Sequence, residues 1–214
     1  MGSGFKIAMR DLEIRGAGNI LGRTQHGHME AVGYDLYCKM LNDAVKKLKG
    51  IKTVEDFDTQ VDLDVDAYIP SDYILNEVQK LDIYKHIASV ESEEEANDLR
   101  DELKDRFGKV PKSADNLIRV SLIREKAHKC YVTDLKGGSE QIRFDMKPDA
   151  KIEIANIPLL LEAYKGKLKF VHKSMPYFLY KYKKENVIEK DEENLLKYTE
   201  SILEDMEKYL CTLS

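Results

Sequence analysis

The spacing of apolar residues changes near residue 130, and this change constrains the fold of the chain more than any other feature. Before it, apolar residues recur every three or four positions, as they do along one face of a helix. After it, short runs alternate apolar and polar residues around turn sequences such as Gly137-Gly138. Helices followed by paired strands predict an α+β domain.

In the part of the chain that begins near residue 68, three helices are expected before the change. Pro70-Ser71-Asp72 is a start signal for the first helix. Ser92 and Glu95 have the spacing of a capping box for the second helix, which Gly108 would end. The third helix is expected over residues 113–129. The apolar stripe of the first helix would comprise Ile74, Val78, Leu81, Tyr84 and Ile87.

Two antiparallel hairpins and a closing helix are expected after the change. The first hairpin would turn at Gly137-Gly138 and the second at Ser174-Met175-Pro176. A short helix over residues 157–164 would lie between them, and the closing helix would span roughly residues 190–210. The two hairpins are predicted to form one small sheet.

The organisation predicted for the whole chain has three parts. Residues 1–50 combine a short strand, a glycine-rich turn and an amphipathic helix. Residues 51–67 are interpreted as a linker, in which apolar residues alternate with aspartates. This alternation fits either a short strand or an extended connector with one wet face. Residues 68–214 would form the α+β domain.

The first 27 residues contain a run that is unusual for a core strand or a surface helix. Asp11, Glu13 and Arg15 crowd together, and Gly16, Gly18 and Gly22 follow them. Glycines allow tight turns and close approach of the backbone. Charges of both signs beside such a turn suggest an element that moves or contacts a ligand.

Composition narrows the classes of function. The net charge is −5 although 34% of the residues are charged, so the overall charge favours protein partners over nucleic acid. Cys38, Cys130 and Cys211 are scattered and form no C-x-x-C pair, which fits a reducing cytoplasm. No apolar run has the length of a signal peptide or a membrane span.

Motifs for catalysis, cofactors or metals are not found. The sequence has no P-loop, so we expect no ATP hydrolysis by this chain alone. The glycines at 16–22 resemble a dinucleotide fingerprint only weakly, because no strand leads directly into them. His26 and His28 lack the spacing of a metal-binding pair. We therefore expect no catalytic, cofactor-binding or metal-binding residues.

Two charged segments have competing interpretations. Residues 164–184 contain seven lysines, no acid and several aromatics. They fit either a nucleic-acid-binding sheet or an amphipathic hairpin with its aromatics in the core and its lysines in water. Residues 91–105 contain eight acids and are interpreted as a solvated helix face.

Several motifs carry a resemblance to a known family. The run at 4–27 resembles the TRG translocation motif of DNA-translocating ATPases. Residues 67–74 and the segment Asp105-Arg106-Phe107-Gly108-Lys109-Val110-Pro111 resemble the C-terminal regulatory domain of bacterial transcription-repair coupling factors. The second match is the more specific, because other proteins with the motif lack this domain.

The resemblance implies that the chain is the C-terminal part of an ATP-dependent double-stranded DNA translocase. The resemblance places residues 1–50 at the end of the second motor lobe, where the motif would form a helical hairpin that couples ATP hydrolysis to translocation. ATP and magnesium would be bound by the motor of the parent protein. The regulatory domain would be autoinhibitory, packing on an N-terminal repair-homology module and masking its UvrA-binding region. RNA polymerase and UvrA would be partners of the parent protein. The motif residues implied are Arg10, Asp11, Glu13, Arg15, Gly16, Gly18, Gln25 and His26.

Overall fold

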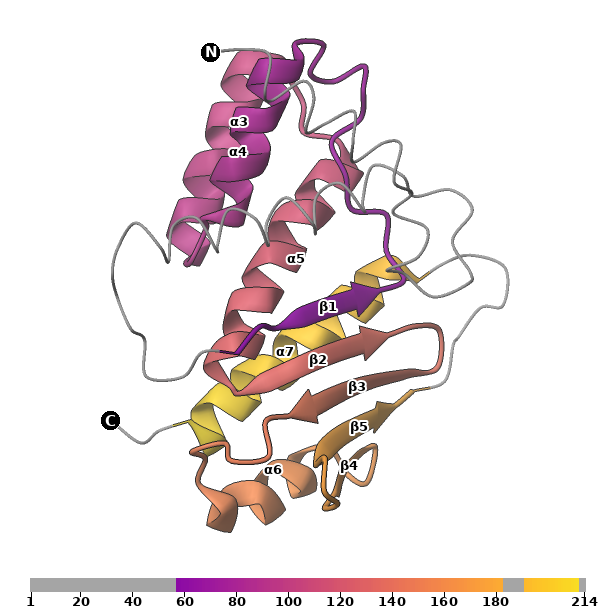
Figure 1. Ribbon diagram of the computed structural model, residues 1–214. Coiled ribbons are helices and arrows are strands. Elements are labelled where there is room, and N and C mark those ends of the chain that lie inside the picture. Colours follow the sequence, from indigo (N-terminus) through magenta and orange to yellow (C-terminus); the bar gives the residue numbers. More distant parts are fainter. Residues whose placement is uncertain (1–56, 183–190, 212–214) are drawn as a thin grey trace, which may run out of the picture. The chain divides into compact units, whose positions relative to one another are not determined.

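The computed structural model describes residues 57–182 and 191–211 (Figure 1). The chain divides into two compact units, Met1–Ile51 and Lys52–Ser214, and all described residues belong to the second. The strand, glycine turn and helix expected within residues 1–50 lie outside the described residues.

The second unit is an α+β domain, as the sequence predicts. Three α-helices precede the hairpins, and a long helix closes the domain. The elements are β1 (Gln60–Leu63), α3 (Glu77–Ala88), α4 (Glu93–Phe107), α5 (Lys112–Lys129), β2 (Val132–Gly137), β3 (Gln141–Met146), η2 (Ile154–Asn156), α6 (Ile157–Ala163), β4 (Leu168–Val171), β5 (Tyr177–Lys181) and α7 (Glu192–Leu210).

The sheet has five strands in the order β1-β2-β3-β5-β4. Both predicted hairpins are present, because β2 pairs antiparallel with β3 and β4 pairs antiparallel with β5. β3 and β5 join the hairpins into one sheet. β1 adds a strand parallel to β2, with Val61 opposite Leu135. Of the two alternatives for this segment, the structure therefore shows the strand, and the residues interpreted as a linker contribute to the sheet.

The first helix begins later than the sequence predicts. Pro70 opens a turn, in which its carbonyl accepts the N–H of Tyr73 at 3.2 Å. The helix starts at Glu77 because the side chain of Asn76 accepts the N–H groups of Val78 and Gln79. The predicted start at Pro70 is wrong, since an equally good capping residue lies six positions on.

This shift also changes the buried face of α3. Val78 is 69% exposed, although the predicted stripe places it in the core. Ile74 is buried but lies ahead of the helix. The buried residues of α3 are Lys80, Ile83 and Ile87. Only Ile87 is therefore common to the predicted stripe and the buried face.

The signals for α4 are confirmed with one change. The Ser92 hydroxyl accepts the N–H of Glu95 at 3.2 Å, as a capping box requires. The carboxylate of Glu95 accepts the N–H of Glu91 at 2.8 Å, so the reciprocal bond closes one residue earlier than in the standard motif. Gly108 follows the helix with φ 84°, a conformation that favours glycine.

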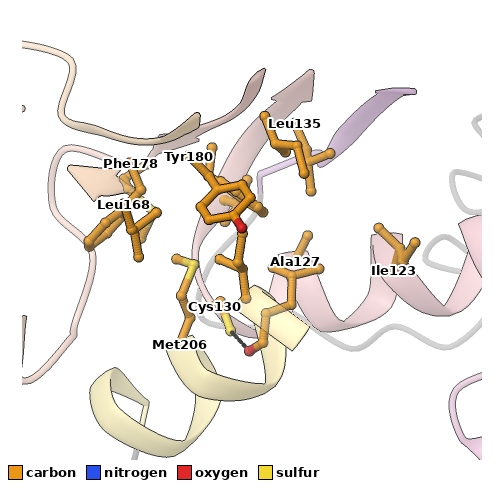
Figure 2. Packing of buried hydrophobic residues seen from close by; sticks show 14 of the residues in the cluster. Ile123, Ala127, Cys130, Leu135, Leu168, Phe178, Tyr180 and Met206 are labelled. Carbon is orange, nitrogen blue, oxygen red and sulfur yellow. Dashed lines mark hydrogen bonds between the residues drawn. The ribbon is translucent and has the colours of Figure 1, made fainter. Parts of the chain in front are cut away.

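The main core lies between one face of the sheet and the helices α5, α6 and α7 (Figures 1 and 2). Leu135 and Phe178 point into it from the strands, and Ile123 and Met206 enter from α5 and α7. The Cys130 thiol is buried there, 3.7 Å from the carbonyl oxygen of Leu203. Helices α3 and α4 pack on α5, so the α5 helix joins the helical part to the sheet.

Candidate interaction surfaces

The eight residues proposed for the translocation motif lie outside the described residues. They are Arg10, Asp11, Glu13, Arg15, Gly16, Gly18, Gln25 and His26. Their roles remain predictions from the resemblance. Within the second unit, the candidate surfaces are formed by charged side chains on α4 and on the hairpin of β4 and β5.

An acidic stripe runs along α4 and consists of Glu94, Asp98, Asp101 and Asp105. Intervals of four, three and four residues place these carboxylates on one face of the helix. All four residues are exposed. None of the four has an ion-pair partner within residues 57–182 and 191–211. The stripe is therefore available to bind a basic surface.

Other carboxylates of the same helix are already engaged. Glu93 lies 3.6 Å from the Lys126 ammonium, and Glu102 lies 3.4 Å from the His86 ring. Glu102 also pairs with Arg106. The prediction that residues 91–105 form a solvated face therefore holds for part of the run, because some of its carboxylates are paired and others are not. The stripe could have been predicted from the sequence, because spacings of four, three and four residues place its carboxylates on one helix face. The number of acids in the run does not show this.

An ionic network joins α5 to α7. Arg119 donates to both carboxylate oxygens of Glu200, at 2.7 and 2.8 Å, and to Glu193 at 2.9 Å. The side chain of Arg119 is only 13% exposed. The hydrogen bonds to Glu200 raise the pKa of Arg119, so the guanidinium keeps its charge. Sequence reasoning did not find this network because its members are far apart along the chain.

Glu192, at the start of α7, binds the segment that follows β1 in the chain. Glu192 is buried and accepts the backbone N–H of Asp66 at 2.9 Å. It also accepts the side-chain amide of Asn116 at 3.3 Å and lies 3.4 Å from the Lys112 ammonium. These contacts anchor the chain between β1 and α3 to the helices α5 and α7.

The basic hairpin of β4 and β5 is amphipathic. Phe178 and Tyr180 are buried, whereas Lys167, Lys169 and Lys181 are exposed. The interpretation with aromatics in the core and lysines in water is therefore confirmed for the described residues. Phe178 and Tyr180 contribute to the core and are not free to stack on bases (Figure 2).

Neighbouring tyrosines are also committed to internal contacts. The rings of Tyr180 and Tyr182 lie 5.6 and 5.2 Å from the ring of Tyr198 on α7. Burial raises the pKa of Tyr182 to about 12. The Tyr164 hydroxyl donates to Asp205 at 2.6 Å. This cluster ties the basic hairpin to α6 and α7.

The described residues contain no group of three or more His, Cys, Asp or Glu residues placed to hold a metal ion. In this same part of the chain, no helix combines the length and the apolar character that a membrane span needs.

Comparison with known proteins decides the family. The transcription-repair-coupling factor of Bacillus subtilis is 46% identical over 155 residues, which cover 72% of this chain and 13% of that protein. The factor of Staphylococcus haemolyticus is 45% identical over 152 residues, which cover 70% and 13%. The family model of the TRCF domain matches residues 63–157. The chain belongs to the transcription-repair-coupling factor family.

A solved structure is similar in fold. The crystal structure of the C-terminal domain of a transcription-repair coupling factor has a TM-score of 0.55 and 24% identity to this chain. It covers 71% of this chain, and the match covers 96% of that domain. This similarity confirms the α+β fold of the transcription-repair-coupling factor domain.

The region matched by the TRCF domain model contains the acidic stripe of α4 and the network residue Arg119. The β4–β5 hairpin and α7 follow the matched region. The chain spans only 13% of the length of these curated relatives.

Proposed function

We propose that this chain is the C-terminal part of an ATP-dependent double-stranded DNA translocase that acts in transcription-coupled repair in the cytoplasm. Its TRG motif couples ATP hydrolysis to translocation. Its TRCF domain is an autoinhibitory protein-interaction module that packs on the N-terminal repair-homology module and masks the UvrA-binding region. DNA, RNA polymerase and UvrA are partners of the parent protein. ATP and magnesium bind the motor, because this sequence has no P-loop.

The observation that supports a protein-binding role is the acidic stripe of α4. Its four exposed carboxylates have no ion-pair partner in the described part of the chain. A basic protein surface could therefore form ion pairs with all four. An exposed ion pair contributes only about 0–1 kcal/mol. Several such pairs together give an interface that is specific but is released when the motor engages DNA or polymerase.

The test uses the full-length parent protein with the stripe neutralised. The variant carries Glu94→Gln, Asp98→Asn, Asp101→Asn and Asp105→Asn. We expect it to raise both DNA-stimulated ATPase activity and UvrA binding, as removal of residues 57–214 would do, because the restraining interface is weakened. ATPase rates and the dissociation constant for UvrA are the measurements.

A matched control removes the same number of negative charges elsewhere. Asp72→Asn, Glu140→Gln, Glu162→Gln and Glu207→Gln change exposed carboxylates off the stripe and should leave both readouts at wild-type values. If removal of the domain lowered both readouts, the domain would be an activator or a required structural part. If removal raised them and the stripe variant did not, the interface would lie on another face.

A further inference from the structure

Strand β4 is a free edge of the sheet. Among residues 57–182 and 191–211, it is the last strand in the sheet order and pairs with β5 alone. The Lys181 N–H donates to the Lys167 carbonyl at 3.0 Å, so Lys167 and, two residues on, Lys169 direct their backbone groups toward β5. Leu168 and Phe170 alternate with them and direct their N–H and C=O groups outward. No backbone hydrogen bond outside the ladder is made by Leu168 or Phe170 to another described residue. This edge has the geometry that accepts an added strand.

Three lysines lie on or directly beside β4 and its neighbour β5, on the face of the sheet that points away from the core. Lys167 and Lys181 are opposite each other, and Lys169, two residues along from Lys167, is on the same face. All three are exposed and have no carboxylate partner in the described ranges. Like charges directly opposite each other in a sheet are destabilising. The lysines at the edge are thus an uncompensated positive cluster.

Other cations on this face are compensated. Arg143 donates to Asp145 at 2.9 and 3.0 Å from its Nε, and Lys136 donates to Asp134 at 2.6 Å. These pairs lie on β2 and β3, away from β4. Among the cations described on this face of the sheet, those without a carboxylate partner therefore lie on or beside β4 and β5.

We propose that the β4 edge binds an extended acidic segment of a partner protein as an added strand. The backbone of that segment pairs with Leu168 and Phe170. Its alternate carboxylates lie beside Lys167 and Lys169, which matches the two-residue period of a strand, and Lys181 adds positive charge from the next strand, β5. Its remaining side chains turn to the other face, beside the half-buried ring of Phe170, which lies 4.7 Å from the ring of Phe178. The edge should therefore bind a segment in which acidic and apolar residues alternate.

The chemistry of the edge favours a peptide over nucleic acid. The outward carbonyls of Leu168 and Phe170 need donors, whereas phosphate oxygens only accept hydrogen bonds. A peptide backbone supplies both donors and acceptors. A second copy of this chain is disfavoured too, because pairing β4 with itself would bring the lysines of both copies together. The β4 edge would bind such a segment whether or not the domain is autoinhibitory.

The first experiment measures binding of synthetic peptides to the complete 214-residue chain. A fluorescent heptapeptide alternating Glu and Val is compared with a peptide of the same composition in which the glutamates are grouped together. We expect the alternating peptide to bind at least tenfold more tightly, with slower amide exchange at Leu168 and Phe170. Two further peptides carry N-methyl groups on alternate amides, one in each register. Only the register whose amides face β4 should lose binding.

The second experiment changes the protein. Lys167→Glu with Lys169→Glu should weaken binding of the alternating peptide at least tenfold. The control pair Lys104→Glu and Lys109→Glu changes exposed lysines outside the sheet and should have no effect. Lys167→Ala with Lys169→Ala tests the same point if the glutamate variants are unstable.

Several results would overturn the proposal. One is that the alternating peptide fails to bind, and another is that the grouped peptide binds with the same affinity. A third is that N-methylation leaves the affinity of the alternating peptide unchanged in both registers. Equal affinity for a short DNA duplex that displaces the peptide would assign the edge to nucleic acid. Concentration-dependent dimerisation that the lysine variants enhance and the peptide blocks would assign it to a second copy of the chain.

Discussion

Gly137 lies where β1, β2 and α7 meet, and the space beside it is filled. A Cβ at this position would lie 2.6 Å from Leu63 Cδ2 and 2.9 Å from Leu195 Cδ1. At the next residue, Gly138, an added Cβ would have no other atom within 4 Å. Two adjacent glycines therefore have different roles: the first permits close packing and the second belongs to the turn.

We predict that Gly137→Ala lowers the free energy of unfolding by about 1 kcal/mol, because two leucine side chains must move to admit the methyl group. Gly138→Ala is the matched control and should change stability by less than about 0.5 kcal/mol. Urea denaturation of both variants measures the difference. Equal stability would mean that the leucines move at no cost.

At the scale of secondary-structure elements, Arg119 joins helix α5 to helix α7. We predict that Arg119→Ala lowers the free energy of unfolding by about 2–3 kcal/mol, since it removes hydrogen bonds between charged groups and leaves Glu200 and Glu193 without their partner. Arg124→Ala on the same helix is the control, because Arg124 makes no such pair among the described residues. Chemical denaturation at pH 7 measures both, and an equal effect of the two changes would contradict this role.

The same network predicts a dependence on pH. Burial opposes ionisation of Glu193, but hydrogen bonds from Arg119 and Lys197 prevail and lower its pKa. A carboxyl with a lowered folded-state pKa contributes stability above its unfolded pKa of about 4.3 and loses it as pH falls through the folded value. The difference between wild type and Arg119→Ala should therefore shrink below about pH 4. A difference that stays constant down to pH 3 would exclude the linkage.

At the scale of the whole domain, residues 57–66 attach β1, the edge strand next to β2, to the rest of the domain. The Phe57 ring stacks on His128 at 4.3 Å, and the Thr59 hydroxyl donates to the Val132 carbonyl at 2.7 Å. β1 then pairs with β2, and the Asp66 N–H binds Glu192. A fragment that begins at residue 68 lacks all of these contacts.

We predict that a fragment of residues 52–214 unfolds cooperatively, whereas a fragment of residues 68–214 is less stable by more than about 3 kcal/mol or does not fold. The physical reason is the loss of an edge strand together with the apolar area that Leu63 buries. Circular dichroism and urea denaturation of both fragments make the comparison. Equal stability would place the start of the domain at residue 68.

Local signals in the sequence determined most of the elements. Gly137-Gly138 marks a hairpin, Ser92 caps α4, and Gly108 ends it. Each of these depends on interactions between residues a few positions apart, so the sequence around the site is sufficient. The acidic stripe of α4 belongs to this class, because its spacing follows from the helix period. The roles of the motif residues, from Arg10 to His26, stay predictions.

Tertiary structure alone decided what joins distant parts of the chain. The parallel pairing of β1 with β2 brings Thr59 to Val132, which is 73 residues away, and Arg119 meets Glu200 across 81 residues. No local pattern specifies such partners, because a four-residue strand fits several neighbours and a charged side chain pairs with any opposite charge in reach. The same reason applies to the free edge at β4. The lysines were visible in the sequence, but their isolation from every acid of the described domain was set by the order of the strands.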